Sequence, residues 1–147
     1  MAADNETIVR RLLEEGWNQH KPNVVDELVA SNFVHHDPAS PDTGTGPEGY
    51  KRLMNLYLSA FPDSKFTIED VISHGDRAVT RWTARATHKG ELNGIPPTNK
   101  QVTVTGVEIA RISSGKMVES WTQWDALGLM QQLGVAAPAA KSKTQAR

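Results

Sequence analysis

The sequence of 147 residues contains no cysteine. It therefore has no disulfide framework, no thiolate nucleophile and no metal site with cysteine ligands. No apolar run approaches the roughly 20 residues that a membrane-spanning helix needs, and the N-terminal segment lacks the apolar core of a secretory signal. These absences favour a soluble, cytoplasmic protein.

Charge of either sign is not in excess, since 16 basic residues stand against 17 acidic ones. This balance gives no electrostatic reason to expect nucleic acid or an anionic membrane as a partner. The sequence also lacks a nucleophile elbow, a Walker loop, a dinucleotide fingerprint and any paired metal-ligand motif. We therefore expect no cofactor and no metal. The class that remains is a pocket that works with acid–base side chains.

The order of helical and strand patterns predicts the fold class. Apolar residues recur at helical spacing over 6–20, 21–29 and 46–62, with a short strand over 31–38. After Pro62 the period changes to two, which indicates a run of antiparallel strands, and one more helical segment ends at Gly134.

This order is typical of an α+β fold in which a curved antiparallel sheet holds helices in its concavity around a pocket. We expect one domain over residues 1–135 and a disordered tail over 136–147.

Strand alternation places one carboxylate on the inner face of the predicted sheet. On one strand Arg81 and Arg85 mark the wetter face, so Trp82 and His88 belong to the inner face. On the next strand the same argument turns Glu108 inward, among valine, glycine and alanine. Desolvation raises the pKa of such a carboxyl group towards the range useful for acid–base catalysis. A salt bridge or a hydrogen bond from a tryptophan N–H is the structural alternative.

Two histidines and the last strand supply further candidates. His35 and His36 are neighbours on a strand and point to opposite faces, so at most one of them lines the pocket and the pair cannot easily bind one metal ion. His88 precedes a glycine at a strand end, where it either takes part in chemistry or anchors the loop. On the last strand both faces carry a tryptophan and polar groups. The sequence leaves open whether Thr122 and Trp124 or the opposite set faces inward.

Three short motifs stand in order along the second half of the chain: HxGxLxGxPPT over 88–98, RIxxGK over 111–116 and QLG over 132–134. Together with IVRRLLEEGWN and TGPEGY near the N-terminus, they make residues 6–135 resemble the SnoaL-like polyketide cyclases. The resemblance implies the α+β cone shared with nuclear transport factor 2. It also implies an intramolecular aldol condensation without cofactor or metal, in which a carboxylate removes a proton next to an ester and polar groups stabilise the enolate.

The resemblance carries over residue by residue with one departure. A family histidine falls on His88, a pocket asparagine on His35 and a pocket histidine on Glu108. The family's acid–base aspartate falls on Thr122, which cannot act as a general base near neutral pH without activation. Either Glu108 has taken over the role, Asp125 reaches in through a bulge, or the protein does not close polyketide rings.

We therefore predict a cofactor-independent lyase, isomerase or aldol-type cyclase that acts on a small, largely apolar carbonyl or ester compound. The predicted catalytic residues are Glu108, His35 and His88, and the predicted pocket residues are His36, Trp82, Thr122, Trp124 and Asp125. Two alternatives of the same fold are a non-catalytic ligand-binding domain and a dimerisation domain. The outward Val107 and Ile109 indicate a homodimer, which we expect as the assembly. Epoxide hydrolysis needs an Asp-Arg-Asp arrangement, and Arg85 belongs to the outer face.

Overall fold

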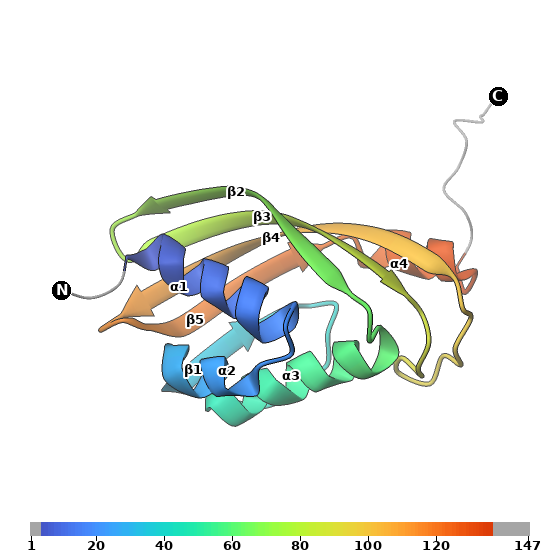
Figure 1. Cartoon of the computed structure of the whole chain (residues 1–147), viewed down its shortest axis with the longest axis horizontal. Coiled ribbons are helices and arrows are strands. Elements are labelled where there is room, and N and C mark those ends of the chain that lie inside the picture. Colours follow the sequence, from blue (N-terminus) through green and yellow to red (C-terminus); the bar gives the residue numbers. More distant parts are fainter. Residues whose placement is uncertain (1–3, 137–147) are drawn as a thin grey trace.

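One strongly bent sheet of five strands organises the chain, and α1, α2 and α3 lie in its concavity (Figure 1). The computed structural model describes residues 4–136. Along the sheet the strands follow the order β1-β5-β4-β3-β2. Their bounds are β1 Val29–His36, β2 Lys65–His74, β3 Arg77–Thr87, β4 Gln101–Ser113 and β5 Lys116–Trp124.

The sheet is mixed, which departs in one respect from the antiparallel sheet predicted from sequence. The strands β2 to β5 are antiparallel neighbours, as predicted, whereas β1 pairs parallel to β5 at the edge of the sheet. A parallel pair needs a long crossover connection. Here the chain passes through α3 and three further strands between β1 and β5, and alternation along the sequence carries no signal for that pairing.

The helices fall where the periodicity places them. The segment α1, Asn5–Arg11, begins with the Asp4 carboxylate accepting from the Thr7 N–H at 2.8 Å and continues as a π-helical segment, η1, over Leu12–Trp17. The others are α2 Pro22–Leu28, α3 Gly46–Ala60 and α4 Ala126–Leu133. Gly134 ends α4 with a left-handed φ of 81°, as glycine at that position predicts. No helix within residues 4–136 is both long and apolar enough to cross a membrane.

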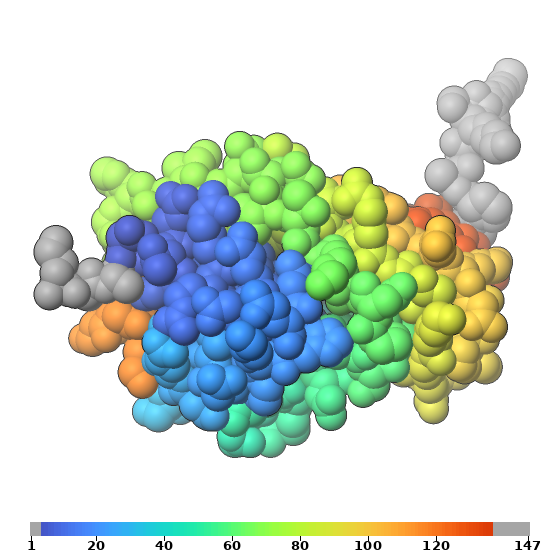
Figure 2. Space-filling view, in the orientation of Figure 1, coloured from blue at the N-terminus to red at the C-terminus, as the bar shows by residue number. Residues whose placement is uncertain are grey.

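Two clusters of buried apolar side chains make up the core. One joins α1, η1 and α2 to the sheet, and the other joins Phe61 and the β3–β4 loop to α4. Tyr57 and Phe66 pack against both clusters, so the two meet around these rings. The space-filling view shows the concave side closed by the N-terminal helices and α3 (Figure 2).

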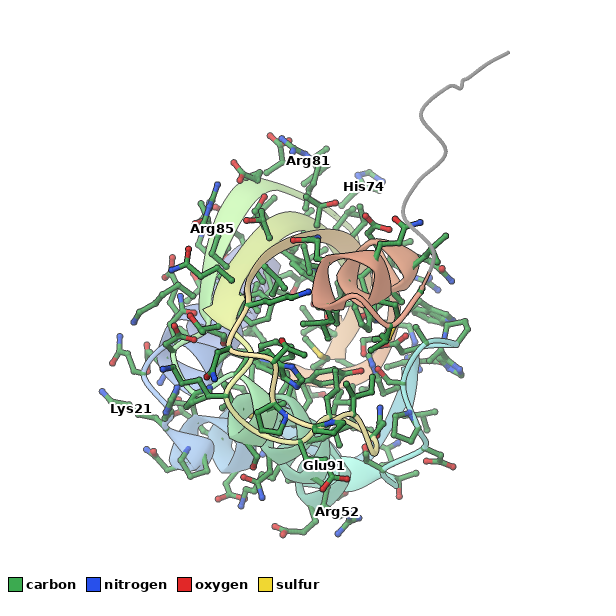
Figure 3. The ribbon with its side chains drawn as sticks, turned by 90° about the vertical axis from the view of Figure 1, so that its right-hand side faces the viewer. Lys21, Arg52, His74, Arg81, Arg85 and Glu91 are labelled. Atoms are coloured by element: carbon green, nitrogen blue, oxygen red, sulfur yellow. The ribbon has the colours of Figure 1, made fainter. Side chains whose placement is uncertain are left out.

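The convex face of the sheet carries the charged side chains, as strand alternation predicts. Seen from the end of the molecule, Arg81 and Arg85 point away from the hollow under the sheet (Figure 3). The inner face of the same strand holds Ala78 and Thr80, which are fully buried, and Trp82, which is 9% exposed. The predicted tail, 136–147, lies outside the described residues except for Ala136.

A tryptophan ring takes the place of a side chain at Gly106, on the inner face of β4. A Cβ there would fall inside contact distance of the Trp82 ring. We expect Gly106→Ala to destabilise the protein by about 1–3 kcal/mol, because the ring has to move in a packed environment. Denaturant unfolding at neutral pH measures the effect.

The matched control is Gly16→Ala, where the nearest atom to a new Cβ is the Met54 methyl at 3.9 Å. We expect this substitution to be neutral or stabilising, because alanine is a better helix former than glycine. Equal losses of stability in the two variants would contradict the close approach of Trp82 to the β4 backbone.

Candidate active site

A cavity of about 130 Å³ lies between the inner face of the sheet and the helices. A single water needs about 10–15 Å³ of such space, so the cavity is large enough for an organic molecule. Its walls are mainly aromatic and aliphatic side chains from η1, α3, α4 and strands β2 to β5. Besides two tyrosines, its polar members are His35, Asp37, Ser64, Glu108 and Thr122.

Glu108 faces this cavity from the middle of β4. The register places Thr80 of β3 on one side of it and Thr122 of β5 on the other. No side chain within residues 4–136 donates a hydrogen bond to its carboxylate or lies within salt-bridge distance of it. Burial raises the pKa of Glu108, and the neighbouring charge of His35 lowers it to a smaller extent. Neither structural alternative, a salt bridge or a hydrogen bond from a tryptophan N–H, is made to Glu108 within the described residues.

The Trp124 N–H donates to Asp37, just beyond the end of β1. The indole Nε1 lies 3.0 Å and 3.2 Å from the two carboxylate oxygens. The Ser40 hydroxyl donates to Asp37 at 2.7 Å, and the Ala39 backbone N–H donates at 2.9 Å. Ser40 Oγ also lies 2.6 Å from the Tyr57 hydroxyl. The Asp37 side chain is only 6% exposed, and this network holds it in place.

The pKa values of the two carboxyl groups of the cavity are shifted in opposite directions. Burial alone would raise the pKa of Asp37. Its hydrogen bonds outweigh that effect and lower the pKa; they come from His35, Ser40, Ala39 and Trp124. Burial acts on Glu108 without such donors to offset it, so the pKa of Glu108 is raised. Two carboxyl groups with pKa values pushed apart are the arrangement that separates a proton donor from a proton acceptor in one site.

His35 lies next to Asp37 and near enough to Glu108 for its charge to act on that carboxyl group. Its Nδ1 forms a 2.7 Å hydrogen bond with the buried Ser120 hydroxyl, which stands opposite it on β5. Its Nε2 is 3.8 Å from Asp37 Oδ2. The ring stacks on Phe33 with centroids 6.3 Å apart. These contacts fix the ring, and they leave its second nitrogen beside the Asp37 carboxylate.

Tyr50, on α3, brings a further hydroxyl to the cavity. Its oxygen accepts a hydrogen bond from Trp17 Nε1 at 3.1 Å, and within residues 4–136 its own O–H hydrogen has no acceptor. Burial, and secondarily the charge of Glu108, raise the pKa of Tyr50 far above its usual value, so the phenol stays neutral. Tyr50 is therefore a hydrogen-bond donor at neutral pH.

The structure brings only part of the predicted site together. Trp82, Thr122 and Trp124 line the cavity with Glu108 and His35, so the face of β5 that carries Thr122 is the inner one. Three other predicted residues lie elsewhere.

His36 points to the outer face, where it stacks on Trp121 and binds Glu119 at 2.7 Å. Alternation next to the inward His35 requires this. Asp125 caps α4 by accepting from the Gly128 N–H at 2.9 Å, and it is exposed.

His88 is fully buried but is not among the residues that line the cavity. Its Nδ1 accepts from the Thr98 backbone N–H at 3.2 Å, and its ring packs against Phe61 with centroids 5.3 Å apart. Its backbone N–H donates to Lys100 and its carbonyl accepts from Asn99, both at 2.9 Å. These contacts join the two ends of the β3–β4 loop, which is the loop-anchoring role that the sequence left open.

Sequence reasoning missed Asp37 and Tyr50. Asp37 is two positions after His35, so strand alternation places both on one face, and this signal was present in the sequence. Tyr50 sits in the apolar stripe of α3 and carries no separate signal. Among residues 4–136, no three histidine or acidic side chains converge closely enough to hold a metal ion.

The chain belongs to the family of SnoaL-like polyketide cyclases, whose family model matches residues 7–133. It is 26% identical to nogalonic acid methyl ester cyclase from Streptomyces nogalater over 121 residues, which is 80% of this chain and 89% of the relative.

Solved structures of similar fold include IdmH from Streptomyces antibioticus, 30% identical with a TM-score of 0.78 over 90% of this chain and 100% of the other. TsrD from Streptomyces laurentii is 28% identical, with a TM-score of 0.79 over 91% and 100%. The resemblance and the α+β cone predicted from sequence are both confirmed, and the family supports a cyclase or isomerase type of function.

Removing the charge of Glu108 is expected to stabilise the fold. A glutamate in the unfolded chain has a pKa of about 4.5, and folding raises it. The unfolded state therefore ionises first, and wild-type stability falls as pH rises from 4.5 to the folded pKa, by about 1.4 kcal/mol per unit. The glutamine of Glu108→Gln does not ionise, so this variant does not lose stability in that way. Its free energy of unfolding should match that of wild type below pH 4 and be higher at pH 7–8. Denaturant unfolding across this pH range measures the difference.

The control is Glu91→Gln, because Glu91 is exposed on the β3–β4 loop (Figure 3). A surface substitution of this kind stays within about 0.5 kcal/mol of wild type. A Glu108→Gln curve parallel to wild type at every pH would show that the carboxyl group is not desolvated.

Proposed function

We propose that this protein is a cofactor-independent enzyme of the lyase, isomerase or aldol-cyclase type that acts on a small, largely apolar carbonyl or ester compound. The observation that carries this proposal is the Glu108 carboxyl group, which faces an aromatic-walled cavity without a hydrogen-bonding partner among residues 4–136. A carboxylate in such a place is a stronger base than one in water, because its charge is poorly solvated.

The distribution of polar groups supports a substrate with a reactive polar end and an apolar body. His35, Glu108 and Thr122 come from the adjacent strands β1, β4 and β5, so they gather at one part of the inner face. Ala84 and Val104 continue the floor of the cavity as small apolar side chains. A flat molecule with its carbonyl at the polar part and its hydrocarbon body along the floor fits this pattern.

The proposed first step is proton transfer from carbon to Glu108. The ionised carboxylate takes the proton from the carbon next to the carbonyl, and the C–H electron pair becomes that of an enolate. The neutral Tyr50 O–H, with its oxygen already accepting from Trp17, donates to the enolate oxygen. His35 is the second donor at this part of the cavity.

The second step returns the proton. In an isomerisation, Glu108 delivers it to another carbon of the enolate. In an aldol closure, the enolate carbon attacks a second carbonyl carbon, and the alkoxide that forms takes the proton from Glu108 or His35. The catalytic carboxyl group thus comes from β4, because Thr122, at the family's acid–base position, has no ionisable group near neutral pH.

Exchange of the acidic proton tests the first step without knowledge of the natural product. Compounds from a panel of aromatic β-keto esters are incubated with the enzyme in D₂O, and deuterium incorporation is followed by NMR. We expect exchange to rise with pH as Glu108 ionises, and Glu108→Gln to lose about 10²–10⁴-fold in rate. Glu91→Gln should keep the wild-type rate.

The same panel separates catalysis from simple binding. A ligand-binding domain would bind panel members and raise its unfolding temperature without exchanging their protons. Wild-type exchange that survives in Glu108→Gln would remove Glu108 from the mechanism.

We also propose that the protein is a homodimer that associates through the convex face of the sheet. One row on this face crosses all five strands and consists of His36, Trp121, Ile109, Val79 and Ile72. Ile72 is 67% exposed and Ile109 is 36% exposed, with Val107 beside them at 39%. Four of these side chains are apolar and stand on neighbouring strands, and an exposed apolar row of this kind is typical of an interface.

Ile109→Glu is expected to convert the dimer to a monomer in light scattering, because it places a charge in the centre of the row. Gln101→Glu, at the start of β4 on the same face, is the matched control and should remain dimeric. A wild-type protein that is monomeric at micromolar concentration would contradict this interface.

A further inference from the structure

Thr80, at the centre of β3, carries a buried hydroxyl without a hydrogen-bonding partner. The residue is 0% exposed, and no acceptor or donor within residues 4–136 meets its Oγ1. Thr80 does not line the cavity, so a bound ligand does not reach this hydroxyl. A buried hydroxyl that stays unpaired lowers stability, and such a group calls for an explanation.

Within the sheet, the neighbours of Thr80 on the inner face include one side-chain acceptor for its proton. Across the ladder it faces Val71 of β2 and Glu108 of β4, and along its own strand it lies between Ala78 and Trp82. Valine and alanine side chains carry no polar atom, and the indole is a donor only. The Glu108 carboxylate is therefore the side-chain acceptor in this ring of neighbours.

The spacing of an antiparallel pair allows the two groups to meet. Residues directly opposite each other have Cβ atoms about 4.5–5.5 Å apart, and the glutamate side chain turns about two further single bonds. At this spacing, rotation about these bonds can bring the carboxylate within hydrogen-bonding reach of the Thr80 hydroxyl while the backbone stays in place. The Glu108 carboxylate itself has no donor in the described chain, so the two unsatisfied groups are complementary.

We propose that Thr80 is a positioning residue for Glu108: its hydroxyl donates a hydrogen bond to the carboxylate whenever that group is ionised. The inference rests on the proposed role of Glu108 as the base. Thr80 adjoins Glu108 on the β3 side, outside the cavity lining, whereas Thr122 adjoins it on the β5 side and lines the cavity. The threonine thereby holds the base in one orientation and favours its charged form.

Other groups that act on the charge of Glu108 come from different elements and stay constant in the test. From β1 these are His35 and, beyond it, Asp37, and from α3 it is Tyr50. The element β5 contributes the uncharged Thr122. A substitution at Thr80 therefore changes one donor and leaves these neighbours in place.

The test is a carboxyl-carbon NMR titration of the full-length protein labelled at its glutamate side chains, with the Glu108 signal assigned by its loss in Glu108→Gln. Thr80→Val has the same shape as threonine but lacks the hydroxyl, and we expect it to raise the pKa of Glu108 by about one unit. Thr80→Ser keeps the hydroxyl and should restore the wild-type value. An unchanged pKa in Thr80→Val would overturn the proposal.

Thr83→Val is the matched control on the same strand. Thr83 is also buried, at 8% exposure, but it lies on the opposite face and donates to Glu69 at 2.8 Å. We expect this variant to leave the pKa of Glu108 unchanged. An equal shift in both valine variants would mean a general disturbance of β3, and the specific role of Thr80 would then be wrong.

Measuring proton exchange distinguishes a failure of this inference from a failure of the proposed function. If Thr80→Val shifts the pKa of Glu108 while Glu108→Gln still exchanges the acidic protons of the panel, the hydrogen bond stands and the catalytic role fails. If Glu108→Gln abolishes exchange while Thr80→Val leaves the pKa unchanged, the catalytic role stands and the positioning role of Thr80 fails.

Discussion

The antiparallel register of β3, β4 and β5 is the constraint on which the site depends. It places Thr80, Glu108 and Thr122 side by side on the inner face of the sheet. Two residues before Glu108 on β4, Gly106 lets the Trp82 ring lie close to the backbone and form a wall of the cavity. A register shift of one residue would turn Glu108 to solvent and an apolar side chain into its place, so the chemistry and the core are fixed by one pattern of backbone hydrogen bonds.

The two acidic groups of the cavity lie in contrasting environments. Asp37 is surrounded by donors and stays ionised, so it serves as a fixed negative charge that orients His35 and Trp124. Glu108 has no such set of donors in the described chain, and burial raises its pKa. The cavity thus combines one carboxyl group held in its charged form with another whose charged form is disfavoured.

Much of this arrangement could be predicted from the sequence, because it depends on local periodicity. The helices, the four antiparallel strands and the inward direction of Glu108 all follow from spacing along the chain. The parallel edge pairing of β1 could not, since it joins segments about 85 residues apart, as the contact between His35 and Ser120 shows. The true position of His88 was also beyond reach, because a strand-end histidine can turn into the loop as easily as into the cavity. Asp37 could have been found by extending the alternation from His35 by two residues.

Because β1 lies at an edge of the sheet, its residues in the cavity wall are easier to displace than those of β4, which lies inside the sheet. β1 is bonded to β5 alone, with an irregular register between Val29 and Val34, whereas β4 is bonded along both sides. To displace β4 would break two ladders, and to displace β1 would break one. A bulky guest would therefore displace His35 and Asp37, at the β1 edge, before it displaced Glu108 in the middle of the sheet.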